Sequence, residues 1–253
     1  MHANVANVQI SPTVLSGSTV FVVDDDISVR ESLELLISTT GCHSETFASA
    51  EEFLSAPHEQ GPCCLVVDVA LPGLSGLELQ KDLVDRTHMP LIFISGRSDV
   101  PISVQAMKAG AIDFLTKPLH DEVVLAAIRQ GVERSRIALR DETELRELKT
   151  RYESLSPRER EVMVLVVAGL LNKQVGGELG ISEITVKAHR GQVMRKMRAE
   201  SLPDLVTMAA RLRLSVRRTS QNLHRMDPAA LARLDLLAGP SNTPARVVQT
   251  ARG

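Results

Sequence analysis

Hydrophobic residues in the first half of the chain form short, nearly continuous runs, separated by stretches with helical periodicity. Continuous apolar runs are typical of strands buried on both faces of a parallel sheet, and their alternation with helices is typical of repeated βα units. We predict strands at Thr19–Val23, His43–Phe47, Cys63–Val67, Leu91–Ser95 and Ala111–Thr116, of which the second and the last have the weaker patterns.

A helical stretch follows each of these strands. The predicted helices are Ser28–Thr39, Ala50–Ser55, Gly76–Val84, Val100–Lys108 and His120–Arg134. Five strands and five helices within about 115 residues predict an α/β, doubly wound (βα)5 domain with a five-stranded parallel sheet over residues 19–133.

The second half of the chain has helical patterning only. Residues 134–155 are densely charged and contain no Pro or Gly, which predicts a helical linker. Its apolar positions recur at helical spacing and are Leu145, Leu148, Tyr152 and Leu155. We expect this stripe to pack against the chain's own domains, and pairing with a second chain is the alternative. Residues 156–212 contain four helical segments and no strand, which predicts an all-α domain of four helices.

The net charge of −2 conceals opposite charges in the two halves. Residues 19–133 hold 7 Lys and Arg against 18 Asp and Glu, a net charge of −11. Residues 157–212 hold 9 against 6, a net +3, and residues 213–253 hold 7 against 2, a net +5. An acidic domain favours the binding of cations, and a basic domain favours the binding of a polyanion.

The two ends of the chain lack regular patterning. Residues 1–18 are small and polar, and we expect a disordered lead-in. Residues 213–253 are rich in Arg, Pro, Ser and Thr, which predicts a basic, mostly disordered tail with one helical stretch at Pro228–Leu237.

The overall composition, with 43% hydrophobic and 24% charged residues, is typical of a soluble globular protein. No apolar run is long enough to cross a bilayer, and no basic region leads into an apolar core at the N-terminus. We therefore expect a cytoplasmic protein with no membrane partner. Cys42, Cys63 and Cys64 lack metal-ligand spacing and are expected to be buried thiols.

Polar residues gather where the predicted strands end. Moving along the chain, these residues are Asp24, Asp25 and Asp26, then Asp68, Ser95 and Lys117. Ligands of open parallel sheets bind at the carboxyl ends of the strands, so we expect these groups to converge. Carboxylates close together repel unless a cation lies among them, and oxygen ligands with room for water suit Mg²⁺. A metal held by Asp25 and Asp68 would assist phosphoryl transfer onto a carboxylate, with Lys117 and Ser95 binding the phosphoryl group.

Four segments, VVDDD, VVDVALPGLSG, FISG and AMKAGAIDFLTKP, resemble the receiver domain of two-component response regulators across residues 19–135. The resemblance implies that Asp68 is the phosphoacceptor and that Asp24, Asp25, Asp68 and the backbone carbonyl of Ala70 form the Mg²⁺ site. It also implies that Ser95 and Lys117 bind the phosphoryl group. By the same likeness, Phe114 swings inward when Ser95 moves and exposes a dimerisation face on the fourth helix and the fifth strand. Ser95 stands where Thr is common, and Phe114 where Tyr is frequent.

A second set of signals begins at Ser156, an N-cap followed by Pro at the first helical position. A short helix over Lys173–Leu179 ends at Gly180, and Ser182 caps the next helix. Two helices joined by a tight turn that contains Gly are typical of a helix-turn-helix. The third helix combines an apolar face, formed by Val186, Val193 and Met197, with cations elsewhere, as a major-groove reader requires. An ordinary amphipathic helix with solvated charges is the alternative.

The segment LGISEITVKAHRGQVMRKM resembles the output domain of LuxR/FixJ-type regulators, with the likeness covering residues 155–212. It implies that Lys187 and Ala188 face base edges, with Gly191 one turn further along. Arg190 and Lys196 are expected to contact phosphates, and Arg195 completes the predicted DNA-binding set. Because Gly191 has no side chain to read a base, specificity is expected to depend on DNA shape or on backbone approach.

Taken together, the two halves predict a phosphorylation-controlled transcription regulator and not an enzyme. We expect a sensor histidine kinase to phosphorylate Asp68, the receiver to form a homodimer, and two DNA-binding domains to engage paired promoter half-sites. Activation is the expected sign of regulation, with RNA polymerase a candidate partner. One alternative is an aspartate-dependent phosphohydrolase, but Ala70 occupies the place of its general acid. The second alternative is a regulator that binds DNA without phosphorylation of its receiver. The complete acidic site argues against this alternative.

Overall fold

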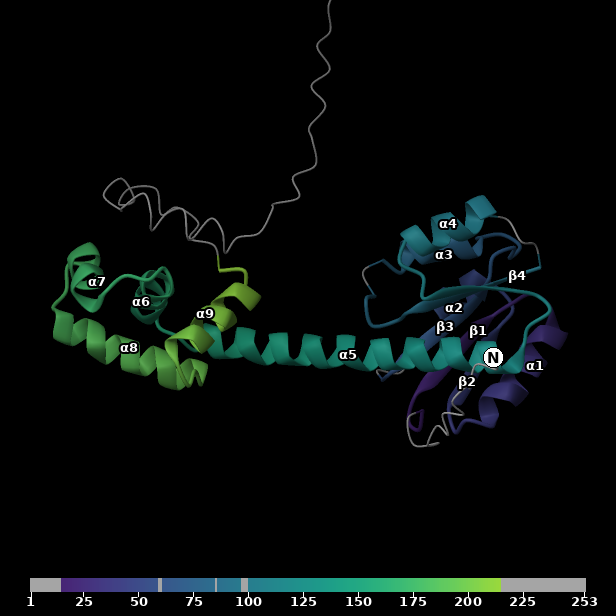
Figure 1. The fold of residues 1–253 in the computed structure, drawn as a ribbon, viewed down its shortest axis with the longest axis horizontal. Coiled ribbons are helices and arrows are strands. Elements are labelled where there is room, and N and C mark those ends of the chain that lie inside the picture. The colour runs from purple at the N-terminus through teal and green to yellow at the C-terminus, as the bar shows by residue number, and fades with distance from the viewer. Residues whose placement is uncertain (1–14, 59–60, 85, 97–99, 215–253) are drawn as a thin grey trace, which may run out of the picture. The chain divides into compact units, whose positions relative to one another are not determined.

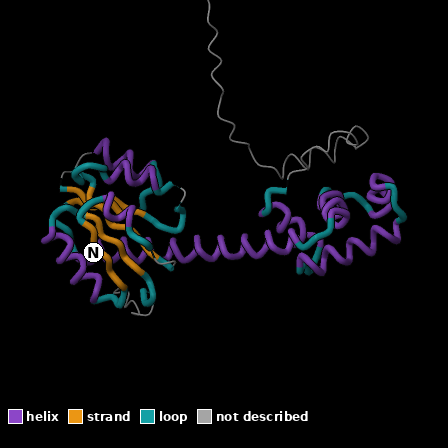
Figure 2. Tube along the Cα trace, turned by 180° about the vertical axis from the view of Figure 1, so that it is seen from behind, coloured by secondary structure: helices purple, strands orange, loops and turns teal. Residues whose placement is uncertain are grey.

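A computed structural model describes residues 15–58, 61–84, 86–96 and 100–214, and the chain divides into two compact units, Met1–Glu142 and Thr143–Gly253. The N-terminal unit contains one five-stranded sheet, drawn orange in Figure 2, with the order β2-β1-β3-β4-β5. All neighbouring strands are parallel. This order and direction confirm the predicted doubly wound α/β fold. The strands are β1 (Thr19–Val23), β2 (His43–Phe47), β3 (Cys63–Asp68), β4 (Leu91–Ser95) and β5 (Asp113–Thr116).

Helices cover both faces of this sheet. Successive residues of each central strand point to opposite faces, so a buried strand contributes to two cores. One core joins alternate residues of β1, β3 and β4 to α2 (Ala50–Ser55), α3 (Gly76–Asp82) and α4 (Val100–Lys108), and the other joins the remaining residues to α1 (Ile27–Ser38) and α5 (Asp121–Glu153). Phe21, Leu65 and Phe93 belong to the first core, and Val22, Val66 and Ile92 to the second. Burial on both faces explains why the central strands have continuous apolar runs.

The folded unit begins a few residues before β1, which the sequence pattern does not predict. Leu15 is buried in the core formed by α1 and α5, although the predicted disordered lead-in extends to residue 18. The Arg136 guanidinium on α5 donates hydrogen bonds to the Ser16 carbonyl at 3.2 Å and to the Ser18 hydroxyl at 3.1 Å. Residues 15–18 therefore belong to the folded unit, because one apolar side chain and two oxygens find partners that lie far along the chain. Residues 1–14 lie outside the described residues.

Helix α5 is one continuous helix from Asp121 to Glu153 and combines the predicted last receiver helix with the predicted helical linker. No Pro interrupts it, and its one Gly, Gly131, is needed for packing, since a Cβ there would lie 2.9 Å from the Cβ of Cys64 on β3. The buried Ser135 hydroxyl accepts a hydrogen bond from the Cys63 amide at 3.0 Å. These contacts hold the first part of α5 against the sheet of the N-terminal unit.

Between residues 157 and 214, the described part of the C-terminal unit contains four helices after α5, as the sequence predicts. They are α6 (Pro157–Val167), α7 (Asn172–Leu179), α8 (Glu183–Met197) and α9 (Leu202–Arg211). Ser156 and Ser182 accept hydrogen bonds from backbone amides at the starts of α6 and α8, which confirms both predicted caps. The buried face of α8 consists of Val186, Val193 and Met197, also as predicted.

The turn between α7 and α8 depends on two glycines. Gly180 ends α7 in the left-handed conformation with φ of 65°, which a residue without a side chain adopts at little cost. A Cβ on Gly176 would lie 2.7 Å from the Ile181 carbonyl oxygen, so Gly176 lets the turn fold back closely onto α7. The two helices therefore meet as a helix-turn-helix (Figure 1).

The apolar stripe of the linker lies at the end of α5 that belongs to the C-terminal unit. Leu148 and Leu155 are buried in the core of this unit, with Tyr152 packed against it. Leu145 is only half-buried and lies outside that core. The last turns of α5 therefore complete the helix-turn-helix core, in agreement with packing on the chain's own domain.

Other expectations concern termini, thiols and membranes. The helix predicted at Pro228–Leu237 and nearly all of the tail lie outside the described residues, although Leu214 still packs on the core of the C-terminal unit. Cys42, Cys63 and Cys64 are free and buried, as expected. Across the described part of the chain, no helix is both long and apolar enough to span a membrane.

His58 makes the stability of the N-terminal unit depend on pH. Its ring nitrogens are buried, and the ring stacks on Phe53 at 4.4 Å and meets Phe21 edge-on at 4.9 Å. Burial, followed by the positive charge of Arg86, lowers the pKa of His58 below its usual 6.5, although Glu45 opposes the shift. Below about pH 6.5 the unfolded chain therefore binds the proton first, and the unfolding free energy falls as the pH decreases.

We expect His58→Phe to weaken this loss of stability between about pH 7.5 and 5.5. Urea denaturation at both pH values measures the difference. His120→Gln, at an exposed position, is the matched control and should lose stability on acidification as the wild type does. Equal losses in wild type and His58→Phe would contradict this role.

Candidate functional site

The acidic turn after β1 is held by its own side chains. The Asp26 carboxylate caps α1 by accepting a hydrogen bond from the Ser28 amide at 2.8 Å. The buried Asp24 carboxylate accepts one from the Asp26 amide at 2.9 Å, while Asp25 is exposed. Three adjacent aspartates therefore have three different environments, because the strand ends and the helix begins within a few residues.

Lys117 joins two strand ends through its ammonium group. Its Nζ donates a hydrogen bond to Asp24 Oδ2 at 2.7 Å and lies 3.1 Å from Asp68 Oδ1. Burial raises the pKa of Asp24, although its hydrogen bonds to Lys117 and Asp26 oppose the shift. Burial also lowers the pKa of Lys117, but its hydrogen bonds to the two carboxylates outweigh this effect and raise the pKa overall. The ammonium therefore stays charged and holds Asp24 and Asp68 at one place.

The sheet register brings Asp68 to this place at the end of β3. Asp68 pairs with Ile94 on β4, and its Oδ2 accepts a hydrogen bond from the Ala70 amide at 2.8 Å. A Cβ on Gly76 would lie only 2.4 Å from the Asp68 carbonyl oxygen, so Gly76 lets the start of α3 approach the acidic site. Gly76 lies in the LPGLSG segment, but the sequence pattern alone does not reveal this close approach.

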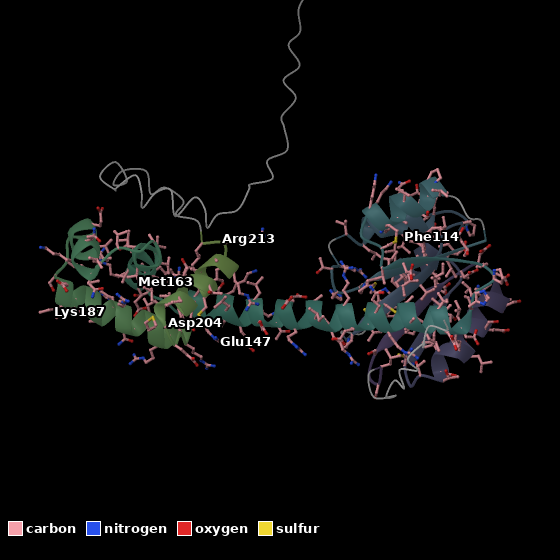
Figure 3. The ribbon with its side chains drawn as sticks, viewed as in Figure 1. Phe114, Glu147, Met163, Lys187, Asp204 and Arg213 are labelled. Atoms are coloured by element: carbon pink, nitrogen blue, oxygen red, sulfur yellow. The ribbon has the colours of Figure 1, made fainter. Side chains whose placement is uncertain are left out.

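Ser95 lies on β4, which neighbours β3, and Phe114 lies on β5, the edge strand beyond β4. Ser95 is buried at the end of β4 and pairs with Thr116 on β5, and its carbonyl accepts a hydrogen bond from the Lys117 amide at 2.8 Å. Phe114, labelled in Figure 3, is half-buried, with its ring centroid 6.3 Å from that of Phe93. The other residues predicted for the site lie on strand ends at one edge of the sheet or in the turns that follow, whereas Phe114 lies two residues before the end of β5.

Arg30 is a further residue at this edge that the sequence analysis missed. Its guanidinium Nη1 donates hydrogen bonds to the backbone carbonyls of Asp24 at 2.6 Å and Asp25 at 3.1 Å. Arg30 therefore links the second turn of α1 back to the acidic turn and fixes its backbone. A single arginine in an amphipathic helix carries no distinctive pattern, so sequence periodicity alone does not reveal this contact.

The residues that the resemblance assigns to a metal provide only oxygen ligands. Within the described ranges, no group of three or more acidic, histidine or cysteine side chains is gathered closely enough to hold a metal ion. Asp24 and Asp68 nevertheless share one ammonium, and Asp25 lies next to Asp24 in the chain and is exposed. A few carboxylate and carbonyl oxygens open to water fit Mg²⁺, which keeps several of its own waters.

Helix α8 of the C-terminal unit presents a separate, cationic surface. Lys187, Ala188, Gly191 and Arg195 are exposed on the side of α8 away from its buried face. The Lys187 ammonium lies 3.2 Å from the Glu183 carboxylate, one helical turn away, and both side chains are exposed. Figure 3 shows Lys187 on α8, away from the core residue Met163. The apolar inner face and the cationic outer face match the arrangement expected of a helix that enters the major groove.

Two cations of the predicted DNA-binding set contact protein groups instead of pointing outward. The Lys196 ammonium lies 2.7 Å from the buried Glu159 carboxylate and donates a hydrogen bond to the Ser154 carbonyl at 3.2 Å. Arg190 donates a hydrogen bond to the Asn172 side chain at 3.2 Å. The hydrogen bond from Lys196, followed by that from the Ser156 amide, lowers the pKa of Glu159 against the effect of burial. Lys196 therefore joins α8 to α6.

Comparisons with known proteins agree with these two units. Residues 20–129 match the response regulator receiver domain, and residues 153–209 match the bacterial regulatory proteins of the luxR family. Nodulation protein W of Bradyrhizobium diazoefficiens is 49% identical over 203 residues, covering 80% of this chain and 89% of that protein. Transcriptional regulatory protein FixJ of Azorhizobium caulinodans is 47% identical over 193 residues, covering 75% and 90%. The solved response regulator StyR has 44% identity and a TM-score of 0.67, over 76% of this chain and 98% of that one.

The chain belongs to the LuxR/FixJ-type two-component response regulators. This response regulator acts as a DNA-binding transcription regulator, and its family is not enzymatic, which excludes the phosphohydrolase alternative. Its receiver implies a cognate histidine kinase, and its helix-turn-helix implies DNA as a partner.

The contacts of Lys196 and Arg195 predict different roles for two cations on one helix. Lys196→Met should lower the unfolding free energy of this response regulator's C-terminal unit by about 1–3 kcal/mol, because it leaves the Glu159 carboxylate without its charged partner. The folded-state pKa of Glu159 is lowered, so this stabilisation is present above its ordinary value of 4.5 and is lost as the pH falls through the folded-state pKa. Urea denaturation of wild type and variant at several pH values measures this effect.

Arg195→Ala is the matched comparison on the exposed face of the same helix. It should leave the unfolding free energy nearly unchanged but lower the salt dependence of binding to a random-sequence duplex, by about 0.9 in log–log slope for one lost phosphate contact. If Lys196→Met instead kept full stability and changed the salt slope, Lys196 would be a phosphate contact and not a link between α6 and α8.

Proposed function

We propose that Asp68 is the phosphoacceptor of this response regulator and that its phosphorylation controls DNA binding. The observation that carries this proposal is the Lys117 ammonium, which lies within 3.1 Å of Asp68 and 2.7 Å of Asp24 at the carboxyl edge of the sheet. The donor is a sensor histidine kinase, whose phosphohistidine gives up its phosphoryl group as the N–P bond breaks and a bond from an Asp68 carboxylate oxygen to phosphorus forms.

The residues at the strand ends have separate tasks in this transfer. Asp24, Asp25, Asp68 and the Ala70 carbonyl would hold Mg²⁺, which, when bound, neutralises charge on the phosphoryl oxygens. Lys117 offers a point charge to the same phosphoryl group, and the Ser95 hydroxyl offers a hydrogen bond. Arg30 keeps the backbone of the acidic turn in place through its two carbonyl contacts.

Helix α4 carries the surface that we assign to dimerisation. Val100, Val104 and Met107 recur at spacings of 4 and 3 residues and are 69%, 44% and 45% exposed. Three large apolar side chains in one row on a short helix favour contact with another protein surface. Phe114 lies on the adjacent strand β5 and is half-buried, so its inward movement upon phosphorylation would change the shape of this face.

A phosphorylated homodimer would bring two copies of α8 to paired half-sites in promoter DNA. We assign contacts with base edges to Lys187, Ala188 and Gly191. We assign contacts with phosphates to Arg195 and to the guanidinium N–H groups of Arg190 that do not bond to Asn172. The response regulator would act in the cytoplasm as an activator, with RNA polymerase a candidate partner once it is bound to DNA.

Phosphorylation of Asp68 can be tested by intact mass. Wild type treated with acetyl phosphate and Mg²⁺ should gain one phosphoryl group, because Lys117 and the metal neutralise charge on the attacking and transferred oxygens. Asp68→Asn should gain none, whereas Asp82→Asn, the same change at an exposed position on α3, should behave as the wild type does. An unchanged mass for folded wild type, or an adduct on Asp68→Asn, would reject the assignment.

Dimerisation through α4 can be tested separately from phosphorylation. Val104→Asp places a charge within the apolar row, so its phosphorylated form should sediment as a monomer under conditions in which the phosphorylated wild type is a dimer. Its phosphoryl adduct should still form, because Val104 is exposed on α4 and is not one of the residues of the acidic site. Val84→Asp introduces the same charge at an exposed position just after α3 and should leave dimerisation intact. Dimers of Val104→Asp at wild-type strength would contradict the assignment.

A further inference from the structure

The outermost row of α8 is unexpectedly apolar near the start of the helix. Ile184, Ala188, Gly191 and Arg195 recur at spacings of 4, 3 and 4 residues, which places them on one face of the helix. This row lies opposite the buried residues Val186, Val193 and Met197, and all four of its residues are exposed. Its first member, Ile184, is 79% exposed, more than any other large hydrophobic side chain in the described parts of the chain.

The fold itself gives no reason for these residue types. A Cβ at Gly191 would meet nothing within 4 Å, so no close packing requires a glycine there, in contrast to Gly176 in the turn before α8. Glycine inside a helix costs about 1 kcal/mol relative to alanine, and a β-branched isoleucine is also a weaker helix former than alanine. An exposed isoleucine followed by two small residues therefore favours contact with something outside the unit.

The charges on α8 indicate what that contact is. Lys187, Arg195 and Arg198 are exposed on the helix, and the acidic residue in its first turn, Glu183, is already paired with Lys187. An apolar surface with cations beside it and further along the helix is complementary to a groove between two phosphate backbones. In the major groove, the apolar group that the bases offer is the 5-methyl group of thymine.

We infer that Ile184 is a specificity-determining residue that packs against a thymine methyl group in each half-site. Side chains in the first turn of a recognition helix point at base edges, which is where Ile184 lies. Ala188 and Gly191 leave little bulk along the same row, so the helix backbone can approach the bases closely enough for this contact. The inference rests on the proposed entry of α8 into the major groove, and it assigns thymine recognition to a residue outside the set Lys187, Ala188 and Gly191.

The experiment uses the full-length protein treated with acetyl phosphate and Mg²⁺. Wild type and Ile184→Ala are each used to enrich binding sites from a library of randomised DNA duplexes. Every thymine of the wild-type consensus is then replaced, one position at a time, by deoxyuridine, which lacks only the methyl group. Binding constants of both proteins are measured for each duplex, and circular dichroism checks that Ile184→Ala is folded.

We expect one thymine in each half-site at which deoxyuridine weakens wild-type binding by about fourfold, the effect of one buried methyl group. Ile184→Ala should bind the thymine duplex more weakly than the wild type does, by a similar factor. Its affinity should not fall further when deoxyuridine replaces thymine at that position. Leu171→Ala is the matched control, since Leu171 is a similarly exposed apolar residue at the N-cap of α7, and it should keep the deoxyuridine penalty.

Two negative outcomes have different meanings. If deoxyuridine affects wild type and Ile184→Ala equally at every thymine, Ile184 does not read a methyl group, and only this inference is overturned. If the phosphorylated wild type enriches no sequence at all, the proposed DNA recognition by α8 is overturned together with it.

Discussion

The Lys117 ammonium between Asp24 and Asp68 is the interaction around which the N-terminal unit is organised. It lies 2.7 Å and 3.1 Å from carboxylate oxygens that follow two different strands, and Lys117 itself follows a third. A parallel sheet brings all its strand ends to one edge, so residues 24, 68 and 117 meet there although they are distant in the chain. Two carboxylates so close together would repel each other without this cation. The pair of cores on the two faces of the sheet holds the strands in the register that this contact requires.

The same edge explains how a receiver uses its fold for chemistry. Arg30 fixes the backbone of the acidic turn, and Gly76 lets α3 begin directly against the Asp68 carbonyl. Arg30 contacts backbone carbonyls of the acidic turn, and Gly76 has no side chain. Both keep the Asp68 carboxylate and its neighbours in position, which in the proposed phosphoryl transfer would lower the reorganisation needed when a phosphoryl group arrives.

The C-terminal unit divides its basic residues between two tasks. Lys196 and Arg190 contact Glu159 and Asn172 and thereby hold α8 against α6 and α7, while Lys187 and Arg195 remain exposed. A helix that enters the major groove must present its outer face at a fixed angle, and the contacts of Lys196 and Arg190 within the unit hold α8 at that angle. Net charge alone does not distinguish the two groups. Leu148 near the end of α5 and Leu155 just after that helix join the same core, so the helix-turn-helix is not complete without residues that precede residue 156.

The sequence by itself determined the elements of both units and the main members of the acidic site. Continuous apolar runs marked the buried strands, serines and glycines marked the helix ends, and aspartates after strands predicted the edge at which they meet. Only the tertiary structure decided that Leu15 belongs to the core, that α5 continues into the second unit, and that Lys196 turns inward to Glu159. The physical reason is that periodicity reports which side of an element a residue occupies. The partner of a lone apolar side chain or a long flexible cation depends on what another element brings within reach.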